Sequence, residues 1–229
     1  MFSYYGRKSK TAGLYPQPKY GKIIEPFAGA AAYSLNGDNW KNEVTIVDKY
    51  EVLINIWKYL QESQPEDILK LPDFNKGDKI SSHSQLIKAE RDLIGFCVNR
   101  GNTTPVRSAS NYNSWDKDKV RIAEDLYKIR HWNIIHGSYR DLENEEATWF
   151  IDPPYQEMGK YYKHNGDSID FYHLAKWCKE REGQVIVCEN KGANWLPFED
   201  LYDFRGIAKN NIESIYYQEE GKKVEFKVN

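Results

Sequence analysis

The fold is decided by residues 22–32, which read Lys-Ile-Ile-Glu-Pro-Phe-Ala-Gly-Ala-Ala-Ala. An apolar run at 23–27 followed by small residues is typical of a buried strand that ends in a tight turn. Small residues let a strand-to-helix turn approach a ligand closely, and an acid about twenty residues further on can bind ribose hydroxyls. Asp48 lies nineteen residues after Gly29, at the end of the next apolar run. The pair indicates a nucleoside-containing cofactor, without distinguishing S-adenosylmethionine from a dinucleotide.

Further apolar runs of four to six residues predict the other strands of a parallel sheet. They lie at 44–48, 133–136, 148–152 and 184–188. Apolar residues follow a helical stripe at 52–60 and again at 171–178, the latter behind the N-cap candidates Ser168 and Asp170. Because strand and helix alternate, the sequence predicts an α/β fold.

Two regions depart from this alternation. Runs at 212–217 and 223–228 flank a five-residue link, a length that suits an antiparallel hairpin closing the sheet. The second region spans residues 62–131, where helical patterns at 85–98 and 117–130 flank the polar segment 99–115. We interpret it as a small, mostly helical lobe inserted into a main domain of residues 1–61 and 132–229.

Composition limits the class of protein. No apolar run approaches the roughly 18 residues of a membrane-spanning helix, and the N-terminus lacks the apolar core of a signal peptide. We therefore expect a soluble, cytoplasmic protein. Cys97, Cys178 and Cys188 form no CxxC pair, so we interpret them as reduced core residues and expect no metal site. The net charge of −2 does not by itself indicate a nucleic acid partner.

A second motif, Asp152-Pro153-Pro154-Tyr155, follows the run at 148–151 directly. Its prolines fix φ and remove two N–H donors, so the loop is stiff and presents acceptors. If the Asp152 carboxylate and the Pro153 carbonyl each accept one N–H of an exocyclic amine, the nitrogen can aim its lone pair at a methyl donor. Tyr155 offers a flat face for a base extruded from a duplex. The alternative is a rigid turn after an edge strand.

In content and order these segments resemble the Dam-type (D12 class) DNA adenine-N6 methyltransferases. The resemblance implies a Rossmann-like methyltransferase sheet of seven strands, S-adenosyl-L-methionine as cofactor, a catalytic domain interrupted by a target-recognition lobe, and double-stranded DNA as partner. Its catalytic residues would be Asp152, Pro153, Pro154 and Tyr155. Its cofactor-binding residues would be Tyr4, Lys8, Glu25, Pro26, Phe27, Ala28, Gly29, Ala30, Asp48, Ser138, Tyr139 and Asp152.

Two positions depart from the family pattern. Ala31 stands where the family has the second glycine of its loop, which predicts a negative φ at that position. Arg7 replaces a glycine in the N-terminal aromatic-x-G-x-K segment.

Residues that contact DNA are expected in two segments. The polar segment 99–115 carries Arg107, Asn111 and Tyr112, and we predict that Arg107 binds guanine in the major groove and Asn111 an adenine edge. A phosphate or solvent contact is the alternative for Arg107. Tyr162 and Lys163 follow the Asp-Pro-Pro-Tyr loop and are predicted to close over the substrate.

The predicted function is therefore methyl transfer from S-adenosylmethionine to the N6 amine of a flipped-out adenine at a specific DNA site. Methylation of cytosine N4, an RNA base or a protein glutamine is the nearest alternative. A catalytically silent DNA-binding module is the alternative from another class. By resemblance, the compact chain suits a phage or mobile-element enzyme in a bacterial host, with a cognate restriction endonuclease as a candidate partner. The recognition sequence and the oligomeric state stay open.

Overall fold

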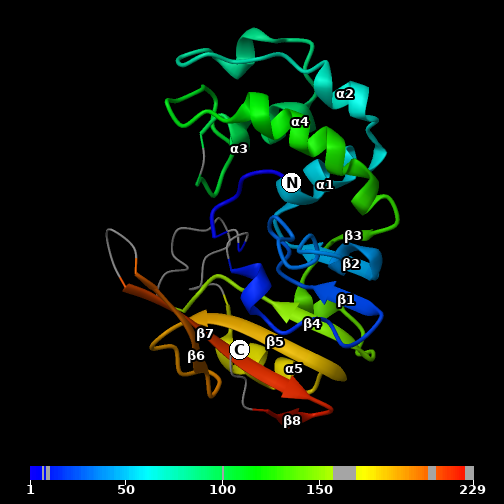
Figure 1. Ribbon diagram of the computed structural model, residues 1–229, viewed down its shortest axis with the longest axis vertical. Helices are drawn as coiled ribbons and strands as arrows, with labels where there is room; N and C mark the ends of the chain where they lie inside the picture. The colour runs from blue at the N-terminus through cyan, green and yellow to red at the C-terminus, as the bar shows by residue number, and fades with distance from the viewer. Residues whose placement is uncertain (7, 9–10, 100, 157–168, 206–209, 225–229) are drawn as a thin grey trace.

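The computed structural model describes residues 1–6, 8, 11–99, 101–156, 169–205 and 210–224, with side chains described outside 202–212. An eight-stranded sheet forms its centre, with the strand order β3-β2-β1-β4-β5-β7-β6 and β8 paired to β7 (Figure 1). The strands are β1 (Lys22–Glu25), β2 (Glu43–Asp48), β3 (Asn133–His136), β4 (Ala147–Ile151), β5 (Gly183–Asn190), β6 (Glu199–Arg205), β7 (Asn210–Glu219) and β8 (Lys222–Lys223).

The sheet is mostly parallel. Strands β1 to β5 pair in parallel, whereas β7 runs antiparallel to both β5 and β6. All five predicted parallel strands are present, and the predicted α/β fold of the methyltransferase type is confirmed. The central strand β4 is buried along its whole length, which explains why its sequence is a continuous apolar run.

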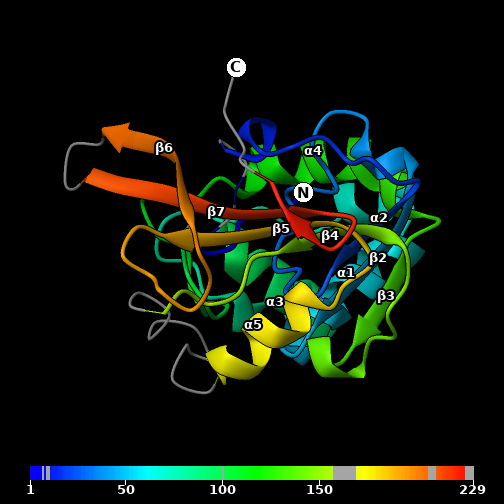
Figure 2. The same cartoon turned by 90° about the horizontal axis from the view of Figure 1, so that it is seen from below.

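Each face of the sheet packs into its own hydrophobic cluster. On one face, strand residues such as Phe150 and Ile186 belong to a cluster with Tyr15 and α1 (Glu51–Glu62). On the other face, the adjacent strand residues Trp149 and Val185 belong to a cluster with α5 (Phe171–Lys179). Figure 2 shows α5 on one face and the N-terminal segment, with its 3-10 helix η1 (Ala12–Leu14), on the other. Both predicted helices are confirmed, and the Asp170 carboxylate caps α5 by accepting the His173 N–H at 2.9 Å.

Residues 62–131 form the helical region at the top of Figure 1. It contains α2 (Pro65–Leu69), α3 (Lys88–Cys97), α4 (Trp115–Asp125) and the 3-10 helices η3 (Ile80–Ser82) and η4 (Leu126–Ile129). Both predicted helical patterns are confirmed, and the segment between them is a loop. The hydrophobic core of this lobe is continuous with that of the main domain, since Phe96, Trp115 and Trp57 belong to one cluster. The boundaries of the lobe stay a prediction.

The C-terminal part of the sheet differs from the prediction. The predicted antiparallel hairpin is present, because β7 pairs with β8, but β7 lies between β5 and the unpredicted strand β6, and the sheet has eight strands rather than seven. Strand β8 is short, and residues 225–228 of the predicted second hairpin strand lie outside the described residues. An edge strand is solvated on one side, so β6 lacks the apolar run by which the buried strands were predicted.

The turn after β1 also differs from the prediction, because it does not lead into an α-helix. Turns and the 3-10 helix η2 (Asn39–Lys41) fill the chain between β1 and β2. Gly29, Ala31 and Gly37 have positive φ values in this stretch, and a right-handed helix cannot accommodate such residues.

The three cysteines are buried and free, as predicted. In the described part of the chain, no helix is long and apolar enough to cross a membrane.

Gly183, the first residue of β5, lies close to the backbone of Ala147, the first residue of β4. It has a φ of +92°, and a Cβ atom there would lie 2.3 Å from the Ala147 carbonyl oxygen. We predict that Gly183→Ala lowers the free energy of unfolding by about 2–4 kcal/mol, through backbone strain and overpacking. Urea unfolding measures the loss. Gly21→Ala is the control, because no atom lies within 4 Å of its Cβ position; equal stability of the two variants would contradict the prediction.

Candidate active site

A cleft opens at the carboxyl ends of β1, β2 and β4, between these strands and the N-terminal segment. Every residue that the sequence predicted to bind the cofactor lines this cleft, from Tyr4 to Asp152. Lys49, Tyr50, Arg140, Phe150, Ile169 and Asp170 line it as well and were not predicted. The empty space of the cleft, including the part open to solvent, is about 1250 Å³.

The turn after β1 is tied to the end of β2 by Asp48. One carboxylate oxygen accepts the Gly29 N–H at 2.9 Å and the other accepts the Tyr50 N–H at 2.8 Å. Burial raises the pKa of Asp48, and these two N–H groups act against that rise. The Tyr4 ring lies so close to Gly29 that a Cβ atom there would be 3.2 Å from it. Asp48 therefore holds the shape of the turn in addition to facing the cleft.

The predicted negative φ at Ala31 is wrong. Ala31 has a φ of +46°, and its N–H donates to the Ala28 carbonyl oxygen at 2.6 Å, which closes a tight turn. A left-handed conformation costs a non-glycine residue about 1–2 kcal/mol. Burial of the Ala31 methyl group in the hydrophobic core offsets part of this cost.

Glu25 supplies a buried carboxylate to the floor of the cleft. The residue is 2 % exposed, and its Oε1 accepts the Ser34 N–H at 2.8 Å. Burial raises the pKa of Glu25 to about 7, although the hydrogen bonds from Ser34 lower it. A cationic ligand group would favour the ionised form of this carboxylate.

The other wall of the cleft is aromatic. The Phe27 and Tyr139 rings lie 5.5 Å apart, tilted by 31°. The Tyr139 hydroxyl is 3.0 Å from His173 Nδ1 and receives a hydrogen bond from Arg140 Nε at 3.3 Å. Ser138 precedes this ring and caps a short 3-10 helix, η5 (Tyr139–Asp141). This part of the predicted cofactor site is thus an aromatic surface.

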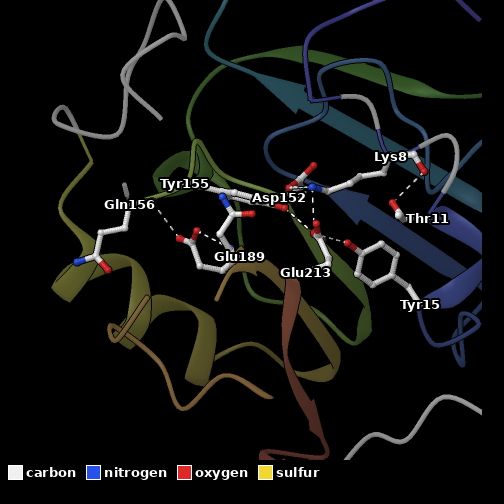
Figure 3. Close-up of polar contacts among 9 residues, drawn as sticks. Lys8, Thr11, Tyr15, Asp152, Tyr155, Gln156, Glu189 and Glu213 are labelled. Atoms are coloured by element: carbon white, nitrogen blue, oxygen red, sulfur yellow. Dashed lines mark hydrogen bonds and ion pairs between the residues drawn. The ribbon is translucent and has the colours of Figure 1, made fainter. Parts of the chain in front are cut away.

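Asp152 shares one ammonium group with a second carboxylate. Lys8 Nζ lies 3.4 Å from Asp152 Oδ1 and 3.0 Å from Glu213 Oε1 (Figure 3). Burial raises the pKa of Asp152 to about 6 and Lys8 lowers it, while the negative charge of Glu213 raises it further. Burial lowers the pKa of Lys8, but Asp152 and Glu213 raise it well above its usual range. Lys8 therefore stays protonated beside the Asp-Pro-Pro-Tyr loop.

The hydroxyl group of Tyr155 lies in this charged cluster. Its hydroxyl donates to Glu213 Oε1 at 2.6 Å and accepts a hydrogen bond from Lys8, whose Nζ lies 4.4 Å from the ring centroid. Pro154 lines the cleft, whereas Pro153 and Tyr155 do not. The sequence predicted the ring of Tyr155 as a stacking surface and did not predict the contacts of its hydroxyl.

Glu189, at the carboxyl end of β5, anchors the chain that follows Tyr155. Its Oε2 accepts the Gln156 N–H at 3.1 Å and the Trp195 indole N–H at 2.9 Å. The Trp195 ring also packs against the Phe171 ring, with the ring centroids 5.3 Å apart. No motif in the sequence pointed to Glu189 or Glu213, because each becomes adjacent to the loop only through strand pairing.

The predicted DNA-reading residues lie outside the cleft. Arg107, Asn111 and Tyr112 are exposed on the loop between α3 and α4. The Arg107 carbonyl accepts the Ile80 N–H at 2.9 Å, so the backbone at this position is held. Tyr162 and Lys163 lie outside the described residues.

In the residues that the structure describes, no group of three or more His, Cys, Asp or Glu side chains could hold a metal ion.

Comparison with known proteins agrees with the site geometry. Residues 12–94, which contain the turn after β1 and Asp48, match the family model of the D12 class N6 adenine-specific DNA methyltransferases. A search of curated proteins found no match. The match over residues 12–94 confirms the resemblance that the motifs carry and shows that this part of the chain is similar to the D12 class N6 adenine-specific DNA methyltransferases, a family of enzymes.

Proposed function

We propose that the protein transfers a methyl group from S-adenosyl-L-methionine to the N6 amine of an adenine flipped out of double-stranded DNA. The observation that carries the proposal is the shared cleft: Asp152 opens into the same space as the turn at Gly29 and the carboxylate of Asp48. The family match supports adenine in DNA over cytosine, RNA or a protein side chain as the methyl acceptor.

The chemistry of the cleft fits this cofactor. Carboxylates can bind the amino group and the ribose hydroxyls of S-adenosyl-L-methionine. Glu25 and Asp48 line the cleft together with the turn after β1. The tilted rings of Phe27 and Tyr139 offer an apolar surface for its adenine. When bound, S-adenosyl-L-methionine supplies an electrophilic methyl group on a sulfonium sulfur.

The Asp-Pro-Pro loop activates the amine. The Asp152 carboxylate and the Pro153 carbonyl accept its two N–H groups, which leaves the nitrogen lone pair free for the methyl carbon. With S-adenosyl-L-methionine bound, this lone pair would take up its methyl group, and the cofactor would leave as a neutral thioether. Asp152 would accept the N–H proton that the methylated nitrogen loses and pass it to solvent. Because Lys8 is already protonated, it stabilises the ionised Asp152 but cannot take this proton.

The remaining assignments concern DNA. We propose that the ring of Tyr155 stacks on the extruded adenine, which requires the ring to turn from its contacts with Lys8 and Glu213 toward the cleft. Arg107, Asn111 and Tyr112 read the sequence from the exposed loop of the lobe, and Tyr162 and Lys163 close over the substrate. Pairing with a restriction endonuclease and a phage origin belong to the same proposal.

The proposal predicts that the purified protein produces N6-methyladenine in mixed-sequence DNA and that Asp152→Ala abolishes this activity. Loss of one preorganised acceptor should slow methyl transfer on the order of 100-fold or more. Cofactor affinity, measured by calorimetry, should change only a few-fold. Asp200→Ala, which removes an exposed carboxylate paired with Lys191, is the control. Near-normal turnover of Asp152→Ala would reject the catalytic role.

The activity should also depend on the ionisation of Asp152. The groups around its carboxylate are Lys8, Glu213, Tyr155 and Glu25. With the pKa of Asp152 near 6, protonation below that pH removes the acceptor, so kcat/KM for DNA at saturating cofactor should fall about tenfold per pH unit below 6. Initial rates between pH 5 and 9 test this expectation, and a flat profile across this range would contradict it.

Sequence reading by Arg107 can be separated from a phosphate contact. A base contact contributes about 1–3 kcal/mol of discrimination, so Arg107→Ala should relax preference at one position of the methylated site. Loss of a phosphate contact would weaken methylation of all sequences alike and lower the salt slope by about one. Methylation profiling on mixed-sequence DNA decides between them. Lys117→Ala, on the first turn of α4, is the control.

A further inference from the structure

Glu213 reaches the active site from the antiparallel end of the sheet. It lies on β7 opposite Asn190, the last residue of β5, and thus beside the edge where the parallel strands end. The residue is 8 % exposed. Burying a carboxylate is costly unless it is paired and hydrogen-bonded, so its contacts show what holds it there.

Three groups from two distant segments converge on the same oxygen of Glu213. The Tyr15 and Tyr155 hydroxyls each donate to Oε1 at 2.6 Å, and Lys8 Nζ lies 3.0 Å from it. Figure 3 shows Tyr15 and Lys8 approaching Glu213 from the N-terminal segment. Glu213 therefore connects this segment to the loop that carries Asp152.

The charges in this cluster do not balance. One ammonium faces two carboxylates, and Lys8 lies closer to Glu213, at 3.0 Å, than to Asp152, at 3.4 Å. Asp152 is also the most exposed of the three side chains, at 22 % against 11 % for Lys8 and 10 % for Glu213. The second carboxylate thus draws the ammonium inward and leaves the first one open toward the cleft.

We propose that Glu213 is a positioning residue that competes with Asp152 for the Lys8 ammonium, so that the Asp152 carboxylate stays free to accept the N–H of the substrate amine. The proposal rests on the proposed function for its consequence in methyl transfer. Without the charge of Glu213, Lys8 pairs fully with Asp152 and occupies the acceptor that the amine needs.

The variant Glu213→Gln tests the role of the negative charge of Glu213, because it removes the charge but keeps an acceptor oxygen for the Tyr15 and Tyr155 hydroxyls. Methyl transfer above pH 7 should slow on the order of 10-fold or more, because a misplaced acceptor loses the aligned geometry. The acid limb of the pH profile should move to lower pH, since the negative charge of Glu213 raises the pKa of Asp152. Glu219→Gln is the control: it lies on the same strand and pairs with Lys19 at the surface.

A purely structural role would slow the reaction without moving the acid limb, and that result would overturn the proposal, as would unchanged rates and pH dependence. The double variant Lys8→Gln/Glu213→Gln removes both charges together, so it leaves no unpaired lysine charge that could destabilise the fold. If Glu213 acts through Lys8, adding Glu213→Gln to Lys8→Gln should cost less than twofold in rate. A full additional loss would exclude the link through Lys8.

A readout in the free protein separates this proposal from the proposed function. Selective carbon-13 labelling of aspartate reports the titration of Asp152 by NMR without DNA or cofactor, with Asp152→Asn for assignment. The midpoint should fall in Glu213→Gln and stay unchanged in Glu219→Gln. An unshifted Asp152 midpoint in Glu213→Gln would overturn the role of Glu213 even if wild-type protein methylates adenine. A shifted midpoint in a protein that does not methylate DNA would reject the proposed function alone.

Discussion

The shared ammonium of Lys8 is the interaction on which the active site depends. It lies between two buried carboxylates, one on the loop after β4 and the other on β7, and it comes from the N-terminal segment. A buried ion pair that loses one partner is strongly destabilised, because the remaining charge stays desolvated. The position of Asp152 therefore depends on three segments that are far apart in the chain.

The N-terminal segment also connects the active site to the helical lobe. Phe2 packs between Trp57 of α1 and Phe96 of α3, at centroid distances of 5.1 and 6.1 Å. The Tyr5 N–H donates to the Asn102 carbonyl, at 3.2 Å, on the loop that follows α3. Residues 1–6 and Lys8 thus connect the helical lobe to Asp152.

The turn after β1 shows how a binding surface is built at a cost in backbone energy. Ala31 adopts a left-handed conformation and Gly29 packs under the Tyr4 ring, which brings backbone N–H groups to the edge of the cleft. Asp48 secures the turn with two charge-assisted hydrogen bonds. The same carboxylate lines the cleft.

The sequence by itself determined the parallel strands, the main helices and the motifs at Gly29, Asp48 and Asp152, because buried strands and tight turns leave local signals of apolar runs and small residues. It did not predict β6, since an edge strand lacks an apolar run, nor the positive φ of Ala31, which the closure of the turn requires. The partners of Asp152 were decided by tertiary structure alone. Glu213 lies sixty-one residues after Asp152 in the chain, and only the insertion of β7 beside β5 brings the two carboxylates to one ammonium.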